Sequence, residues 1–132
     1  MRSMRRVLAI LVTLLSTGLV ACNSHLAKSE LIGHYVMEMP GRKVELTLSP
    51  NGAFTQKVVF RDGIRNASGE WEFTPRPATV VLKNGLEVDS EREAITVNVL
   101  AMAVSKQWGR VYLEYDPDHE YRFQKDKDNG SR

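Results

Sequence analysis

The chain has very little cysteine, and this scarcity limits both what can hold the fold together and what chemistry is available. Cys22 is the only cysteine among 132 residues. No disulfide can therefore close within the chain, and the domain has to be stabilised by packing. His25 is the nearest histidine to Cys22 and gives no zinc-finger spacing, so we expect no metal site there.

The sequence also lacks a catalytic constellation. Serine, histidine and aspartate all occur, but no glycine pattern of a nucleophile elbow accompanies them. The stretch DPDHE at 116–120 groups three carboxylates around a histidine, yet the turn-forming aspartate and proline explain it better than a metal site does. We expect a protein that is not an enzyme and holds no metal.

No excess of positive charge remains once the N-terminus is set aside. The chain has 18 Lys plus Arg against 16 Asp plus Glu, and three of the arginines, Arg2, Arg5 and Arg6, stand in the first 21 residues. Residues 22–132 thus carry 15 basic against 16 acidic side chains, a net charge of −1. With this balance of charge, electrostatic attraction gives no reason to expect nucleic acid as a partner.

The longest apolar run is too short to cross a membrane. It extends over 7–20 without a charge and falls short of the roughly 20 residues that a membrane span needs. Arginines precede it and the small residue Ala21 follows it, which is typical of a secretory signal. We predict that residues 1–21 are a signal peptide that is cleaved.

The residues Leu19, Val20, Ala21 and Cys22 resemble the lipobox of bacterial lipoproteins. The resemblance implies that the Cys22 thiol carries a diacylglycerol, that cleavage precedes it, and that its new amino group is acylated, for example with palmitate. Two or three acyl chains anchor a protein stably where one does not. The alternative is an unlipidated cysteine near an ordinary cleavage site. The lipobox explains the arginines, the apolar run and the residues before Cys22 better than this alternative does.

Asn23 follows this cysteine where enterobacterial lipoproteins that stay at the inner membrane tend to have aspartate. The resemblance therefore implies a lipid-anchored protein of the bacterial cell envelope, at the outer membrane and facing the periplasm. We expect residues 22–30 to be a lipidated tether, because they are polar and without periodicity. The charged residues 126–132 are predicted to be a disordered tail.

Between these ends, residues 31–125 are predicted to form a single β domain. Apolar and polar residues alternate with period two, as in KVELTLS, and turn residues such as those of SPNGA separate the alternating stretches. This pattern predicts an antiparallel meander, closed as a barrel or folded as a sandwich, and closure would remove exposed strand edges. The expected strands lie around 34–39, 43–49, 53–60, 69–73, 80–82, 94–104, 110–115 and 120–124.

The segment from Ser90 to Val104 allows two interpretations. Ser90 and Glu93 have the spacing of a helix capping box, and an apolar helical face could follow. The β-branched run from Ile95 to Val99 favours a strand instead. We predict a strand over 94–104.

Part of the domain resembles small lipocalin-like bacterial lipoproteins, notably the N-terminal barrel of copper-resistance and envelope-stress lipoproteins. The resemblance is carried by three stretches, LIGHYVMEMP, VELTLSPNGAFTQ and ASGEWEFTPRPATVVLKNG. The matching positions are Gly33, Tyr35, Asn51, Gly52, Gly69 and Trp71. The resemblance implies an all-β fold, a small antiparallel meander barrel of about eight strands. The paired cysteines of those barrels are missing, so copper or redox sensing does not follow.

Three features suggest binding: Gln56, the stretch VLAMAV and Trp108. Gln56 stands on the otherwise apolar face of Phe54, Val58 and Phe60, so it could point a polar group into a barrel cavity. A strand end or a bulge is the preferred explanation, because a bulge shifts the face by one residue. The stretch VLAMAV is apolar on both faces, so another segment of the chain or a partner should cover Leu100, Met102 and Val104, and we expect cover by the chain itself.

Trp108 in SKQWGR is expected at a hairpin tip, where it could anchor a partner or cap the barrel, and we predict capping. The resulting hypothesis is a non-enzymatic binding module for a small apolar ligand or envelope component, with no cofactor beyond the lipid on Cys22. The alternative is a protein-binding inhibitor, immunity or envelope-assembly lipoprotein that uses Leu100, Met102 and Trp108. Its partners would be the membrane and a periplasmic protein.

Overall fold

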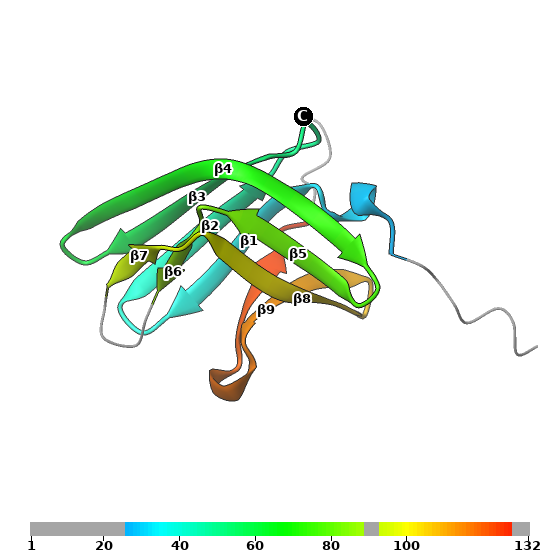
Figure 1. The fold of residues 1–132 in the computed structure, drawn as a ribbon. Coiled ribbons are helices and arrows are strands. Elements are labelled where there is room, and N and C mark those ends of the chain that lie inside the picture. The colour runs from blue at the N-terminus through cyan, green and yellow to red at the C-terminus, as the bar shows by residue number, and fades with distance from the viewer. Residues whose placement is uncertain (1–25, 89–92, 128–132) are drawn as a thin grey trace, which may run out of the picture.

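The computed structural model describes residues 26–88 and 93–127 (Figure 1). Cys22 and the predicted signal peptide lie outside these ranges. Within them the strands are β1 (Gly33–Met39), β2 (Arg42–Leu48), β3 (Ala53–Phe60), β4 (Gly63–Pro75), β5 (Ala78–Lys83), β6 (Leu86–Val88), β7 (Ala94–Thr96), β8 (Val99–Gln107), β9 (Arg110–Asp116) and β10 (Tyr121–Lys125), with two 3-10 helices, η1 (Lys28–Leu31) and η2 (Pro117–His119).

Eight of these strands form a closed barrel in the order β1-β10-β9-β8-β5-β4-β3-β2, with every neighbouring pair antiparallel. The prediction of an all-β antiparallel barrel of about eight strands is confirmed. β6 and β7 pair only with each other, as a small second sheet. Closure of the sheet shortens the unpaired strand edges, which reduces a route to aggregation.

Alternation along the strands fills the barrel interior. In β2, Val44, Leu46 and Leu48 are buried, whereas the residues between them are partly exposed. Burial of a side chain of this size stabilises the fold by about 1.5–3 kcal/mol. The largest buried side chains are Trp71, Tyr35, Phe54, Phe123, Leu31, Met37, Leu46, Leu48, Leu82, Leu86, Met102 and Leu113.

Trp71 connects the core to the β2–β3 turn. Its indole Nε1–H donates to the Ser49 carbonyl at 2.9 Å, and its backbone N–H donates to the Gly52 carbonyl at 2.8 Å. Gly52 has a φ of 84°, a left-handed conformation that glycine adopts without a Cβ penalty. Asn51 Oδ1 accepts a hydrogen bond from the N–H of Ala53, which fixes the tip of the turn.

β4 begins earlier than the sequence pattern indicated. Residues 61–66 read as a turn, but only Arg61 and Asp62 form one, and β4 extends over 13 residues from Gly63. β5 pairs only with 71–75 of β4, so 63–70 are paired to β3 alone. Because side chains such as Arg65 and Asn66 are exposed there, the apolar alternation that marks a strand is absent.

The segment 94–104 is extended, as predicted, but it is divided between two sheets. β7 ends at Thr96 and β8 begins at Val99. Two backbone hydrogen bonds join the β5–β6 connection to the β7–β8 connection. Asn84 N–H donates to the Asn98 carbonyl at 3.1 Å, and Val97 N–H donates to the Gly85 carbonyl at 2.9 Å. The chain therefore leaves the barrel wall after β5, forms β6 and β7, and returns as β8.

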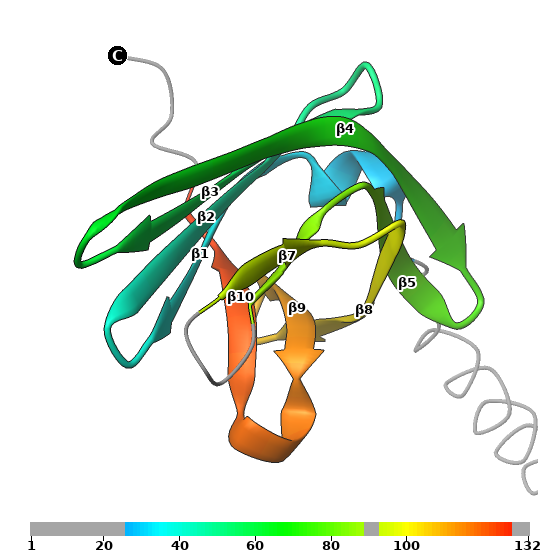
Figure 2. The same cartoon turned by 60° about the vertical axis from the view of Figure 1, so that its left-hand side comes forward.

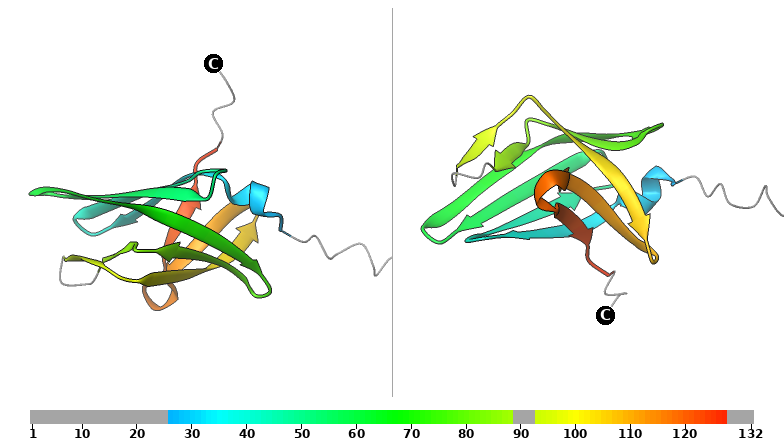
Figure 3. Two further views of the ribbon diagram at one scale, coloured as in Figure 1. Left: turned by 45° about the horizontal axis from the view of Figure 1, so that its top comes forward. Right: turned by 90° about the horizontal axis from the view of Figure 1, so that it is seen from below.

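The two ends of the barrel differ. We call one the η1 end; it carries η1 and the turns at 49–52, 76–77 and 108–109. We call the other the mouth; it carries the turns at 40–41 and 61–62, η2 and the β6–β7 pair. Figures 2 and 3 show β6 and β7 beside the barrel opening on the side away from η1.

The η1 end is capped by η1, whose first three residues fall within the predicted tether. Leu31 is fully buried, its carbonyl accepts a 2.6 Å hydrogen bond from the Tyr35 hydroxyl, and the Glu30 carbonyl accepts one from Lys125 Nζ. The expected tether over 22–30 thus has its last residues packed on the barrel. The predicted tail over 126–132 likewise begins with a residue held to the barrel, because Asp126 N–H donates to the His34 carbonyl at 2.8 Å.

Candidate functional site

Gln56 lies in the barrel interior and is 2% exposed. β3 pairs with β4 in continuous register from Ala53 to Phe60, so neither a bulge nor a strand end explains its orientation. Its side chain donates from Nε2 to the Leu86 carbonyl at 2.9 Å and accepts from the Leu86 N–H at Oε1 at 2.7 Å. Gln56 therefore points inward, whereas a strand end or a bulge was the preferred explanation of its position, and the group that it binds is the backbone of β6.

Tyr115 binds the other end of β6 in the same way. Its hydroxyl accepts from the Val88 N–H at 2.6 Å and donates to the Val88 carbonyl at 2.9 Å. β3 and β9, which carry Gln56 and Tyr115, stand on opposite sides of the closed barrel. β6 therefore spans the mouth between opposite walls, with one polar side chain replacing a strand partner at each end.

Leu100 and Met102 of β8 face the barrel interior, whereas the alternative function, protein binding, required them to face a partner. Met102 is 1% exposed and belongs to the core, and Leu100 packs against that core. The exposed face of β8 consists of Val99, Ala101 and Ala103. Leu100 and Met102 are thus covered by the barrel's own interior, and the hypothesis of a partner surface on them is corrected. Since both faces of β8 are apolar, the pattern could not indicate which one turns inward.

A pocket of about 390 Å³ opens at the mouth between β6, the β1–β2 turn and the end of β9. This mouth pocket is lined by Met39, Pro40, Arg42, Glu87, Val88, Leu100, Tyr115, Asp116, His119 and Tyr121. The apolar walls and the charged rim combine the properties of a site for an amphipathic small molecule, and the volume is within the range of such sites.

The rim of the mouth pocket is ordered by contacts around η2. His119 Nδ1 lies 2.8 Å from Asp116 Oδ2, and the His119 ring stacks on Tyr121 with centroids 6.0 Å apart. The hydrogen bond from His119 holds the pKa of Asp116 below its usual range. The carboxylate is therefore ionised at neutral pH and is used to cap η2. Among the residues that the structure describes, no group of three or more His, Cys, Asp or Glu side chains is placed to bind a metal ion.

Two other hollows are less suited to an apolar ligand. One, of about 610 Å³, lies between the β1–β2 and β3–β4 turns and is lined by turn residues such as Arg61 and Asp62 and by the adjoining strand ends. The other, of about 420 Å³, lies over β1 to β4 and is lined largely by polar side chains, among them His34, Thr47 and Lys57. Neither draws its walls from side chains of the core to the extent that the mouth pocket does.

Trp108 is fully exposed, so the prediction that it caps the barrel is wrong. Gln107 pairs with Arg110 across the β8–β9 turn, which leaves Trp108 and Gly109 as its central residues with φ of 55° and 76°. Positive φ at both positions is typical of a type I′ turn, in which asparagine followed by glycine is favoured. A tryptophan at the first position adopts a costly conformation and gains no burial from it.

Replacing Trp108 with asparagine should stabilise the protein by about 1 kcal/mol, because asparagine tolerates the left-handed conformation that tryptophan resists. Urea unfolding of the two proteins measures the difference. Trp108→Ala is the control: it removes the indole but keeps an ordinary Cβ residue at positive φ, so it should give little gain. Equal stability of Trp108→Asn and Trp108→Ala would contradict the explanation by backbone strain.

Burial raises the pKa of Tyr115 above its ordinary value of 10.0, with a smaller opposing effect of the hydrogen bond to Val88. A raised folded-state pKa means that the neutral hydroxyl stabilises the fold below pH 10, and that this contribution is lost as the pH rises through the folded-state pKa. We expect the melting temperature of Tyr115→Phe to be lower than that of the natural protein at neutral pH. Above pH 10 the two should converge. A constant difference across this range would contradict the assignment.

The sequence did not indicate Tyr115, Tyr121 or Met39 as residues of a site. All three read as ordinary strand residues, because their function at the mouth depends on where β6 and η2 come to lie. One local signal was present: Tyr115 stands directly before DPDH, so its side chain had to lie where β9 ends. Arg42 was overlooked for the same reason, as it begins β2 directly after the turn that borders the pocket.

In the part of the chain that the structure describes, no helix combines the length and the apolar character needed to cross a membrane. Comparison with protein-family models, with curated proteins and with solved structures found no match.

Proposed function

We propose that this chain is a lipid-anchored lipoprotein of the bacterial cell envelope, and that its barrel binds a small apolar or amphipathic ligand, or an envelope component, without catalysing a reaction. The resemblance of residues 19–22 to a lipobox supports the anchor at Cys22, and with it a position at the outer membrane facing the periplasm. The closed barrel is compatible with a binding module.

The observation that carries the binding proposal is the mouth pocket. Apolar surface from Met39, Leu100 and Tyr121 forms its wall, and the charged groups of Arg42 and Asp116 lie among its lining residues. A ligand with an apolar body and a polar head would bury the first part and keep the second at the rim. The pocket is also at the end of the barrel opposite η1, so a tether that enters at η1 leaves it accessible.

The ligand is expected to occupy the mouth pocket and not the centre of the barrel. Large side chains such as Trp71, Phe54 and Phe123 fill the centre, and Leu86 and Val88 of β6 are buried above them. Access to deeper space would require β6 to give up its hydrogen bonds to Gln56 and Tyr115. A small ligand needs no such rearrangement.

Native mass spectrometry of the lipid-free chain Asn23–Arg132, purified from periplasm, tests this proposal. We expect a co-purifying small molecule on the natural sequence, its loss in Leu100→Asp, and its retention in Val99→Asp. Leu100 lines the pocket and Val99 is 61% exposed on the opposite face of the same strand. The absence of any ligand, or equal retention by both variants, would overturn the proposal, provided that circular dichroism shows both variants to be folded.

A second candidate function is protein binding, as in an inhibitor, immunity or assembly lipoprotein. The observation that favours it is the outer face of β8, where Val99, Ala101 and Ala103 are exposed and lie opposite Lys83, Val81 and Thr79 of β5. A pull-down from periplasmic extract should then capture a stoichiometric protein. Val99→Asp should abolish that capture and Leu100→Asp should spare it, which is the reverse of the ligand result.

A further inference from the structure

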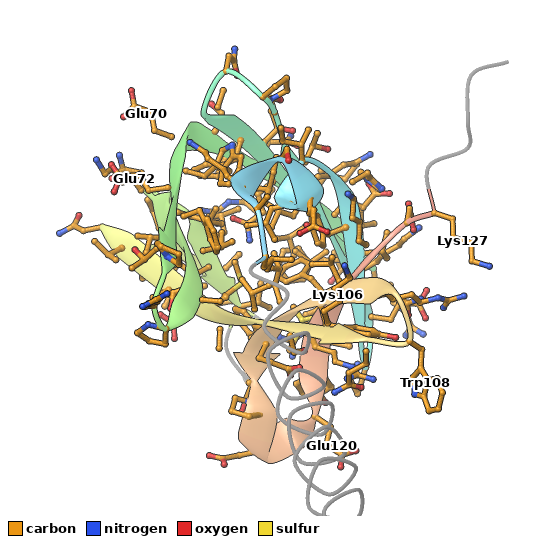
Figure 4. All side chains as sticks on the ribbon, turned by 90° about the vertical axis from the view of Figure 1, so that its right-hand side faces the viewer. Glu70, Glu72, Lys106, Trp108, Glu120 and Lys127 are labelled. Atoms are coloured by element: carbon orange, nitrogen blue, oxygen red, sulfur yellow. The ribbon has the colours of Figure 1, made fainter. Side chains whose placement is uncertain are left out.

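The η1 end presents one large aromatic side chain to solvent. Trp108 is 100% exposed at the tip of the β8–β9 turn, and Figure 4, which faces the η1 end, shows it pointing away from the barrel. Trp71, the other tryptophan, is 2% exposed. A fully exposed tryptophan in a strained turn position has no role in the stability of the barrel, and this directs attention to a function at the surface.

Two basic side chains stand on the same hairpin as this tryptophan. Lys106 and Arg110 are both exposed there, close in sequence to Trp108. The carboxylate of Glu30 in η1 is held by Lys106 Nζ at 3.0 Å, which also fixes the hairpin to η1.

The chain enters the barrel at this same end. Leu26 is the first described residue, and it packs against the core next to η1. Cys22 precedes it by four residues, which can span at most about 14 Å when fully extended. An anchor on Cys22 would therefore keep the η1 end close to the membrane surface and direct the mouth away from it.

We infer that the η1 end is a seat for an anionic lipid bilayer, with Trp108 in the headgroup region and Lys106 and Arg110 of the same hairpin close to the lipid phosphates. This inference rests on the lipid anchor of the proposed function. Tryptophan is enriched where its ring can sit at the level of the headgroups, and basic side chains are attracted to anionic lipid. The seat orients the barrel so that the mouth pocket opens into the periplasm.

Vesicles with a chemically attached chain test the seat directly. Because Cys22 is the only cysteine, the chain Cys22–Arg132 can be coupled at that position to a maleimide lipid in vesicles of phosphatidylethanolamine and phosphatidylglycerol. This chain contains every residue of the barrel. Lipids brominated near the headgroup should quench a large part of the tryptophan emission, and most of that quenching should disappear in Trp108→Phe.

A tryptophan at the mouth is the matched control. Ile64 is 55% exposed on β4 beside the β3–β4 turn, so Ile64→Trp in the Trp108→Phe background should show no added quenching. Double replacement of Lys106 and Arg110 by glutamine should weaken quenching several-fold, whereas double replacement of Arg61 and Arg65 by glutamine at the mouth should leave it unchanged. High salt should imitate the first pair of substitutions.

Unchanged Trp108 emission with brominated lipid, or equal quenching of the Ile64→Trp reporter, would overturn the seat. Shielding of Trp108 by a periplasmic protein in place of lipid would overturn it as well. The maleimide bond replaces the biological anchor, so these failures would leave the lipidation of Cys22 unaffected. Conversely, a lack of lipid on Cys22 in cells would be detected by labelling and not by this assay.

Discussion

Replacement of Gln56 by leucine is expected to lower the free energy of unfolding by about 2–5 kcal/mol. Leucine fills nearly the same space but provides no hydrogen bond to the N–H and carbonyl of Leu86, which are bound by Gln56 at 2.7 and 2.9 Å inside the barrel. Each buried polar group left without a partner costs about 1–3 kcal/mol. Urea unfolding measures the loss, and amide hydrogen exchange at Leu86 should become faster.

Gln124→Leu is the matched control for this substitution. Gln124 is exposed on β10, so the same chemical change there removes no buried hydrogen bond and should have little effect. If Gln56→Leu were as stable as Gln124→Leu, the hydrogen bonds from Gln56 to β6 would not be contributing to the free energy of unfolding.

Gly69→Ala is expected to destabilise the barrel by about 1–3 kcal/mol or more, because the interior there has no room for a methyl group. A Cβ at Gly69 would overlap the backbone carbonyl oxygen of Lys83 and would lie 3.0 Å from the Phe54 ring. Neither neighbour can move without shifting a strand. The melting temperature and urea midpoint measure the effect.

Gly63 on the same strand provides the comparison. A Cβ at Gly63 meets nothing within 4 Å, so Gly63→Ala should be neutral or slightly stabilising through the reduced freedom of the unfolded chain. Similar stabilities of Gly69→Ala and Gly63→Ala would show that the close approach of Gly69 to Lys83 does not constrain the fold.

The fold was predictable where one face of each strand is buried and the other is exposed to solvent. Val44, Leu46 and Leu48 alternate with polar residues because their side faces the core, and this regularity is visible in the sequence. The turn at Asn51 and Gly52 was visible for a similarly local reason, since positive φ favours glycine. Local patterns of this kind were sufficient to predict an antiparallel meander, whereas the choice of a barrel over a sandwich came from the resemblance to lipocalin-like lipoproteins.

The pattern failed where a strand lacks that asymmetry. β8 is apolar on both faces, so the sequence could not show that Met102 turns inward and Val99 outward. The first part of β4 is exposed around Arg65, so it resembled a turn. In both cases the deciding fact is which other strand lies alongside, and that is a property of the closed barrel.

The candidate site was only partly predictable for the same reason. Gln56 could be identified because a polar residue interrupts an apolar face, but its partner Leu86 lies 30 residues further along the chain. Tyr115 and Val88 meet only because β6 crosses the mouth between opposite walls. β6 lies outside the barrel wall, and contacts between such a segment and the barrel produce no periodic pattern in the sequence.

The central claim is that a lipid on Cys22 tethers this barrel to the cell envelope. Metabolic labelling with an alkyne analogue of palmitate in a Gram-negative host, followed by membrane fractionation, tests it most directly. We predict that the natural sequence is labelled and found in the outer-membrane fraction, and that Cys22→Ser is neither labelled nor processed. An unlabelled natural protein, or continued labelling of Cys22→Ser, would contradict the account.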